Sequence, residues 1–184
     1  MSDAIDLTGE PLIPAMTAFL TKFSTPAIDE NHVILGQYSS SALPTDGNDF
    51  CVFTPVNQQR SGTTVQEWHP ETQTTILCEY VTVTVQVDCY SSDPIYARER
   101  AQTYELVARS PMGVKHFKHY GMDCQYAEGV RNLTGLLDDS RYVSRWMFEI
   151  RLGYTKRVSV PQRYFDAVRI DVHNADVSFY PRGK

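Results

Sequence analysis

The longest alternation of apolar and polar side chains lies in residues 75–90. Because side chains two residues apart point to the same face of a β-strand, this pattern predicts a long strand with one buried face. The segment from Val81 to Val87 is uncharged and lacks Pro and Gly, so it would be prone to aggregate at an open sheet edge. We therefore expect this strand at the centre of a sheet or covered by a neighbour. Its buried face would carry Val81, Val83, Val85, Val87 and Cys89.

A second alternation, over residues 142–157, predicts another long strand. We expect Trp146 in the core, because it shares one face of this strand with Phe148, Ile150, Leu152 and Tyr154. Shorter strands are predicted at residues 32–38 and 168–172. The polar residues 39–48 predict a loop.

Residues 50–70 predict a β-hairpin of their own. Two β-prone segments, residues 50–54 and 63–68, flank a segment that contains glycine. The turn is therefore expected near Arg60, Ser61 and Gly62. Such a hairpin is longer than a small domain needs, so we expect it to project from the domain.

Three helices are predicted. Residues 10–23 form the first, with an apolar stripe made by Leu12, Met16, Phe19 and Phe23. The third helix is short, covers residues 114–120 and ends at Gly121.

The second helix has the clearest start signal, with Asp93 as N-cap and Pro94 at the first helical position. Its predicted buried stripe consists of Ala97, Ala101, Tyr104 and Ala108. The charged residues of this helix, expected in solvent, are Arg98, Glu99, Arg100 and Glu105.

The order of these elements predicts an α+β fold, with a mostly antiparallel β-sheet flanked by helices and a projecting β-hairpin. The 184 residues are expected to form a single domain, residues 1–184, with residues 1–31 as an N-terminal helix and arm.

Composition favours a folded protein, because 42% of the residues are hydrophobic and 21% are charged. No apolar segment approaches the roughly 18 residues of a membrane span. The acidic N-terminus lacks the pattern of a signal peptide. We therefore expect a soluble intracellular protein that has no membrane partner.

Charge is unevenly divided along the chain. Residues 1–90 hold two basic and 11 acidic side chains, a net charge of −9, whereas residues 91–184 hold 15 basic and 11 acidic side chains, a net charge of +4. The sequence contains no short, strongly basic segment of the kind that predicts sequence-specific nucleic-acid binding. The division favours an acidic surface from the first half and a basic surface from the second, which could join subunits head to tail.

The four cysteines do not form a recognisable motif. Cys51, Cys78, Cys89 and Cys124 include no C-x-x-C pair, and we expect all four to be reduced. Cys89 is predicted to be a small core residue.

Catalytic and ligand-binding signatures are missing from the sequence: there is no nucleophile elbow, phosphate-binding loop, dinucleotide fingerprint or H-E-x-x-H motif. A zinc set made by His116, His119, Asp123 and Cys124 is weak, because Lys115 and Lys118 are interleaved with the histidines. We expect a solvated helix face there. We predict no catalytic, cofactor-binding or metal-binding residues, and no cofactor.

Two further patterns are interpreted as ordinary structure. The adjacent carboxylates Asp138 and Asp139 are expected in a solvated turn before a strand. Asn132, Leu133 and Thr134 match the glycosylation triplet, which has no meaning without secretion.

Several segments, in order, resemble tailed-bacteriophage neck proteins of the terminator type. The first is the strand end Gln86-Val87-Asp88-Cys89-Tyr90, followed by a helix that begins with small and basic residues. The resemblance covers most of residues 32–181. It continues through Tyr126-Ala127-Glu128, Val130-Arg131-Asn132-Leu133-Thr134, Tyr142-Val143-Ser144-Arg145-Trp146, Val158-Ser159-Val160-Pro161-Gln162 and Tyr180-Pro181.

The resemblance implies a structural virion protein without enzymatic activity. It implies a homo-oligomeric ring of six copies that joins the portal connector to the tail, with phage DNA passing through the lumen without sequence-specific binding. The implied partners are the neighbouring neck and tail proteins, and the implied location is the virion, after assembly in the host cytoplasm. Two alternatives stay open: another ring of the phage tail, such as a tail-tube or baseplate-hub relative, and an intracellular enzyme of unknown chemistry.

Overall fold

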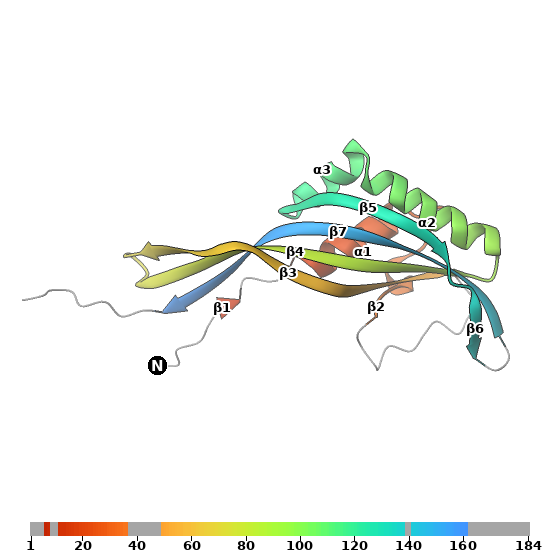
Figure 1. The fold of residues 1–184 in the computed structure, drawn as a ribbon, viewed down its shortest axis with the longest axis horizontal. Coiled ribbons are helices and arrows are strands. Elements are labelled where there is room, and N and C mark those ends of the chain that lie inside the picture. Colours follow the sequence, from red (N-terminus) through yellow and green to blue (C-terminus); the bar gives the residue numbers. More distant parts are fainter. Residues whose placement is uncertain (1–5, 8–10, 37–48, 139–140, 162–184) are drawn as a thin grey trace, which may run out of the picture.

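Three long strands form the centre of the fold in the computed structural model, which describes residues 6–7, 11–36, 49–138 and 141–161. They are β3 (Phe50–His69), β4 (Thr74–Ser91) and β7 (Arg141–Pro161). Strand β4 pairs antiparallel with β3 along one edge and with β7 along the other (Figure 1). Both edges of Val81–Val87 are therefore covered, as its composition predicted.

Shorter strands complete the sheet on both sides. Strand β2 (Val33–Leu35) pairs parallel with the start of β3. The outer edge of β7 pairs antiparallel with three strands, namely β6 (Gly135–Asp138), β5 (Met122–Asn132) and β1 (Asp6–Leu7). The predicted α+β class with a mostly antiparallel sheet is confirmed.

Three helices share one core with the apolar face of the sheet. They are α1 (Leu12–Lys22), α2 (Pro94–Ala108) and α3 (Pro111–His119), and a short 3-10 helix, η1 (Glu30–His32), precedes β2. Tyr104 of α2 links the layers, since its ring lies 5.9 Å from that of Phe19 and 6.1 Å from that of Phe148. None of the helices in the described part of the chain is long and apolar enough to cross a membrane.

Local signals placed the helix ends well. Asp93 caps α2, because its carboxylate accepts a hydrogen bond from the amide of Ile95 at 2.8 Å, and Pro94 is the first helical residue. Helix α3 begins at Pro111, earlier than predicted, because the Ser110 hydroxyl caps it. Gly121 ends α3 with φ +70, a conformation that glycine adopts without steric cost.

The prediction of a turn near Arg60–Gly62 is wrong. Residues Phe50–His69 form one continuous strand, and the segment around Gly62 is a bulge between Ser61 and Val65. Glycine suits both structures because some types of each use a positive φ, which is +86 at Gly62. The chain reverses at residues 70–73, where β3 passes into β4.

Two other predictions need revision. Trp146 is only half-buried and packs against the core, whereas Phe148, Ile150 and Leu152 are fully buried. The reason is position, because the pairing of β5 with β7 ends at Trp146. Of the predicted strand at residues 32–38, only Val33–Leu35 is a strand; the loop at 39–48 and the strand at 168–172 lie outside the described residues.

Beyond the helices the strands continue as an arm, defined here as residues 61–80 together with the part of β7 that pairs with them (Figure 1). Every residue from 57 to 73 is exposed. An extended strand rises about 3.3 Å per residue, so the seven residues from Val81, which is buried beneath the helices, to Thr74 carry the arm tip about 23 Å beyond the core.

Candidate assembly surfaces

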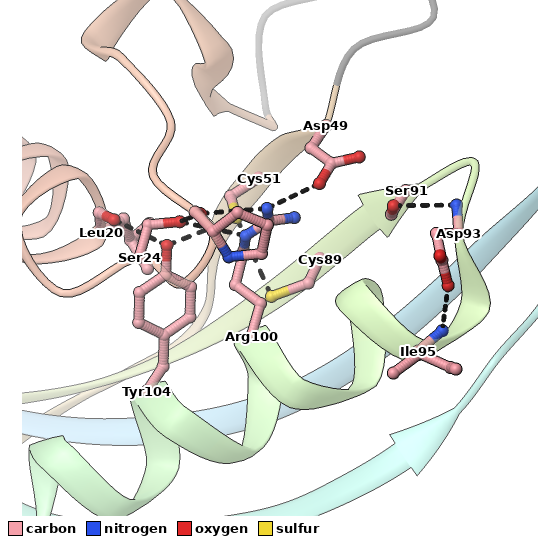
Figure 2. Close-up of polar contacts among 11 residues, drawn as sticks. Leu20, Ser24, Asp49, Cys51, Cys89, Ser91, Asp93, Ile95, Arg100 and Tyr104 are labelled. Atoms are coloured by element: carbon pink, nitrogen blue, oxygen red, sulfur yellow. Dashed lines mark hydrogen bonds and ion pairs between the residues drawn. The ribbon is translucent and has the colours of Figure 1, made fainter.

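A buried arginine lies where the first helix, the second helix and the central strands meet. The side chain of Arg100 in α2 is fully buried (Figure 2). Its guanidinium donates to the Asp49 carboxylate at 2.7 Å, to the Ser24 hydroxyl at 3.0 Å and to the carbonyl of Pro26 at 3.1 Å. Burial, the largest single influence, lowers the pKa of Arg100, but the hydrogen bond to Asp49 and the electrostatic interactions with Cys51, Asp49 and Tyr104 together outweigh it, so the pKa is raised. The guanidinium therefore holds three chain segments together as a permanent cation.

The sequence interpretation of Arg100 as a solvated residue is wrong. Arg100 lies three residues after Ala97 and four before Tyr104, so it belongs to the same helical stripe as these buried residues. The spacing by itself predicts a buried position for Arg100, whereas the charge of its side chain predicts a solvated one. An arginine can occupy such a position when it finds acceptors, as Nε and Nη2 of Arg100 do, whereas its Nη1 is buried without a hydrogen-bond partner among the described residues.

Beside Arg100, two cysteines lie opposite each other on the paired strands β3 and β4. The sulfur atoms of Cys51 and Cys89 are 3.8 Å apart, and both thiols are free and fully buried. Burial raises the pKa of Cys89 far above its usual value, so the thiol stays protonated and unreactive. Tyr104 donates to the carbonyl of Leu20 at 2.6 Å and completes this buried polar cluster (Figure 2). The predicted role of Cys89 as a small core residue is confirmed.

The opposite face of the sheet carries a polar cluster built from the motif residues. Asp88 accepts from the guanidinium of Arg145 at 2.9 Å and from the amide of Gln86 at 2.8 Å. The rings of Tyr90 and Phe50 stack with centroids 4.5 Å apart, and Arg145 lies 5.7 Å from the centroid of Tyr90. Burial raises the pKa of Tyr90 and keeps its hydroxyl neutral. The cluster therefore ties β3, β4 and β7 together on the face that the helices leave uncovered.

Further along this face, a tyrosine lies across a glycine. A Cβ atom at Gly153 would come within 1.9 Å of the Tyr80 hydroxyl, so the absence of a side chain leaves room for the tyrosine. The Tyr80 hydroxyl accepts from the side-chain amide of Gln125 at 3.4 Å. Three strands, β4, β5 and β7, meet at this contact.

On the helical side, a groove of about 640 Å³ lies between α1 and α3, and we call it the α1–α3 groove. Its floor is partly aromatic, and its basic side chains are Lys22, Lys115, His116 and His119. Glu30 is the one acidic side chain among the described lining residues. The groove also contains Ala18, Thr21, Phe23, Met112 and Tyr120.

The structure does not assemble the weak zinc set. The Nε2 atom of His116 lies 3.0 Å from the carbonyl of Ala15 in α1, so it carries a proton and donates. The Cys124 thiol donates instead to the carbonyl of Ala108 in α2 at 3.4 Å, and burial raises its pKa to about 11. His119 stacks edge-on against Tyr120. Among the described residues, no group of three or more His, Cys, Asp or Glu side chains is placed to hold a metal ion.

The remaining candidates also have structural surroundings. The side chain of Asn132 accepts from the amide of Thr134 at 2.9 Å, which is a local turn at the end of β5. Asp138 is the last residue of β6, and Asp139 lies outside the described residues.

The two oppositely charged halves of the chain do not form two separate faces. Strand β4 of the first half pairs along its length with β3 on one side and with β7 of the second half on the other. The basic α1–α3 groove also takes Lys22 from the acidic half. Charge must therefore be compared between local surfaces, because strand pairing mixes residues that are distant in sequence.

Taken together, the described residues offer surfaces for contact: the arm, the α1–α3 groove and the polar sheet face. No curated protein sequence matches the chain. The family model described as phage neck terminator protein matches residues 12–176, which include the helices, the central strands and the motif residues around Asp88. Members of that family are structural proteins of the phage neck. The chain therefore belongs to the phage neck terminator protein family.

Proposed function

We propose that the protein forms a closed ring in the phage neck and joins the portal connector to the tail. The chain acts as one domain over residues 1–184, and six copies form the ring. The partners of the ring are the neck protein above and the tail protein below. DNA passes through the lumen without sequence-specific contacts, and assembly takes place in the host cytoplasm before the ring becomes part of the virion.

The arm is the observation that carries this proposal. Its tip lies about 23 Å along β4 from the buried Val81, and β3 within it is exposed from residue 61 to the turn. The β3 strand of the arm has no buried side chain and so adds little to the core of a monomer, whereas a subunit that must reach a neighbour needs such an extension. A closed ring requires two different complementary patches on each subunit, and the arm and the helical side of the core are two such surfaces.

The test is the mass and shape of the purified protein. Light scattering coupled to size exclusion, followed by negative-stain imaging, is expected to give a closed ring with a central lumen. Rings that stack into open-ended tubes would favour the tail-tube alternative. A compact monomer at all concentrations would contradict the proposal.

A shortened arm provides the matched variant. Deleting Glu67, Trp68, Thr75 and Ile76 removes two cross-strand pairs and preserves the alternation of the flanking residues. This variant is expected to fold, with an unchanged far-ultraviolet spectrum, but to remain monomeric. Deleting residues 58–64, which surround the turn that the sequence predicted, would instead interrupt β3 where Gln58 and Gln59 pair with Val83 and Thr82. Rings formed by the shortened variant as readily as by the wild type would exclude the arm from assembly.

A further inference from the structure

The α1–α3 groove has the chemistry of a site for an acidic segment. Lys22, Lys115 and His119 are exposed at its rim, and Glu30 is the acidic lining residue. Met112, with 60% of its surface exposed, and the ring of Phe23 give the groove apolar surface between the cations. Its volume of about 640 Å³ falls within the roughly 300–1,000 Å³ typical of binding pockets.

The arm tip, residues 63–76, has the complementary chemistry. It contains Glu67 and Glu71 and no Lys or Arg. Both glutamates are exposed, and Val65 exposes 53% of its surface beside them. The tip therefore presents two negative charges together with apolar surface, which matches a groove that combines cations with an apolar floor.

The tip cannot reach the groove of its own subunit. The paired strands hold it about 23 Å beyond the core, directed away from the helices (Figure 1). Although β3 bulges between Ser61 and Val65, β4 pairs with β7 without a register shift up to Thr74, and this continuous pairing supports the arm along its length. An acceptor for the tip must belong to another molecule.

We propose that the arm tip of one subunit docks in the α1–α3 groove of the next copy of the same chain. The inference rests on the proposed ring and specifies its contact. Glu67 and Glu71 pair with Lys22, Lys115 and His119, while apolar side chains of the tip cover Met112. Because tip and groove are different surfaces, the contact runs head to tail, which is the kind of interface that a closed cyclic ring requires. The charges set encounter and register, so association slows as salt is added.

Substitutions that reverse the charges of the arm tip or of the groove test the contact directly. The tip variant Glu67→Lys/Glu71→Lys and the groove variant Lys22→Glu/Lys115→Glu each place like charges at the interface. Each variant is expected to fold and to associate more weakly than the wild type by a factor of about ten or more. An equimolar mixture of the two is expected to form mixed rings, because each tip then meets a groove of opposite charge. A chain with all four substitutions is expected to assemble alone.

The matched control for the groove variant is Arg98→Glu/Lys118→Glu. It changes the net charge by the same amount at two exposed helical positions outside the groove lining, and it is expected to assemble like the wild type. A second measurement uses Glu71→Cys/Lys115→Cys, which on oxidation is expected to give cross-linked multimers that reducing agent dissolves. Neither single cysteine variant should give them.

The outcomes separate this inference from the proposed ring. Wild-type rings together with tip and groove variants that assemble normally would overturn the docking site and leave the ring in place. Folded variants that fail to form mixed rings would also overturn it. A wild-type protein that stays monomeric would contradict both proposals.

Discussion

Arg100 in α2 and Asp49 before β3 form an ion pair of 2.7 Å around a guanidinium that is fully buried. Removing one partner of a buried pair leaves the other without compensation and typically costs about 3–5 kcal/mol. We therefore expect Arg100→Ala to lower the free energy of unfolding by roughly that amount in urea titrations.

The neighbouring exposed residue provides the control for this variant. Arg98→Ala is expected to change the free energy of unfolding by no more than about 0.5 kcal/mol. Equal stability of the two variants would show that the Arg100 network contributes nothing to folding.

The contact between Tyr80 and Gly153 predicts a coupled pair of substitutions. A methyl group at position 153 would lie within 1.9 Å of the Tyr80 hydroxyl, so Gly153→Ala must displace the tyrosine ring. We expect a loss of about 1–3 kcal/mol, as for other overpacked sites. In a Tyr80→Ala background the same substitution is expected to cost clearly less, and a double-mutant cycle measures the difference. Strict additivity would contradict the proposed steric origin.

Core truncations along β7 are expected to differ by position. Phe148 is fully buried, so Phe148→Ala should cost about 3–5 kcal/mol. Trp146 is half-buried where the pairing with β5 ends, so Trp146→Ala should cost less despite the larger side chain. Thermal or urea unfolding of both variants decides the order. A larger loss for Trp146→Ala would place that residue in the core, as the sequence alone predicted.

His116 predicts an acid-sensitive contribution to stability. Burial lowers its pKa below the usual 6.5, although the hydrogen bond to Ala15 acts against this shift, and the nearby Lys22 and His119 lower the pKa further. The unfolded chain therefore binds a proton more readily than the folded protein as the pH falls through 6.5, and stability is lost on acidification.

The comparison uses His116→Gln, which keeps a donor for Ala15 but does not titrate. The stability advantage of the wild type over this variant is expected to shrink between about pH 7.5 and 5.5. Urea midpoints at several pH values measure it. A constant difference across this range would show that His116 does not titrate differently in the folded protein.

The sequence by itself determined the elements whose signals are local. The alternation around Val85 and Ile150 placed the two long strands, and Asp93 with Pro94 placed the start of α2. The uncharged composition of Val81–Val87 also predicted that neighbouring strands cover this segment. These conclusions held because strand periodicity and helix capping depend on residues a few positions apart.

Tertiary structure decided the features that depend on pairing between distant residues. Gly62 permits a turn or a bulge equally well, and only the continued pairing of β3 with β4 selects the bulge. Arg100 is buried because Asp49, Ser24 and Pro26 converge on it from 51, 76 and 74 residues away. The α1–α3 groove likewise exists only where two helices distant in sequence pack side by side, because a surface of that kind is a property of the packed chain and has no local pattern.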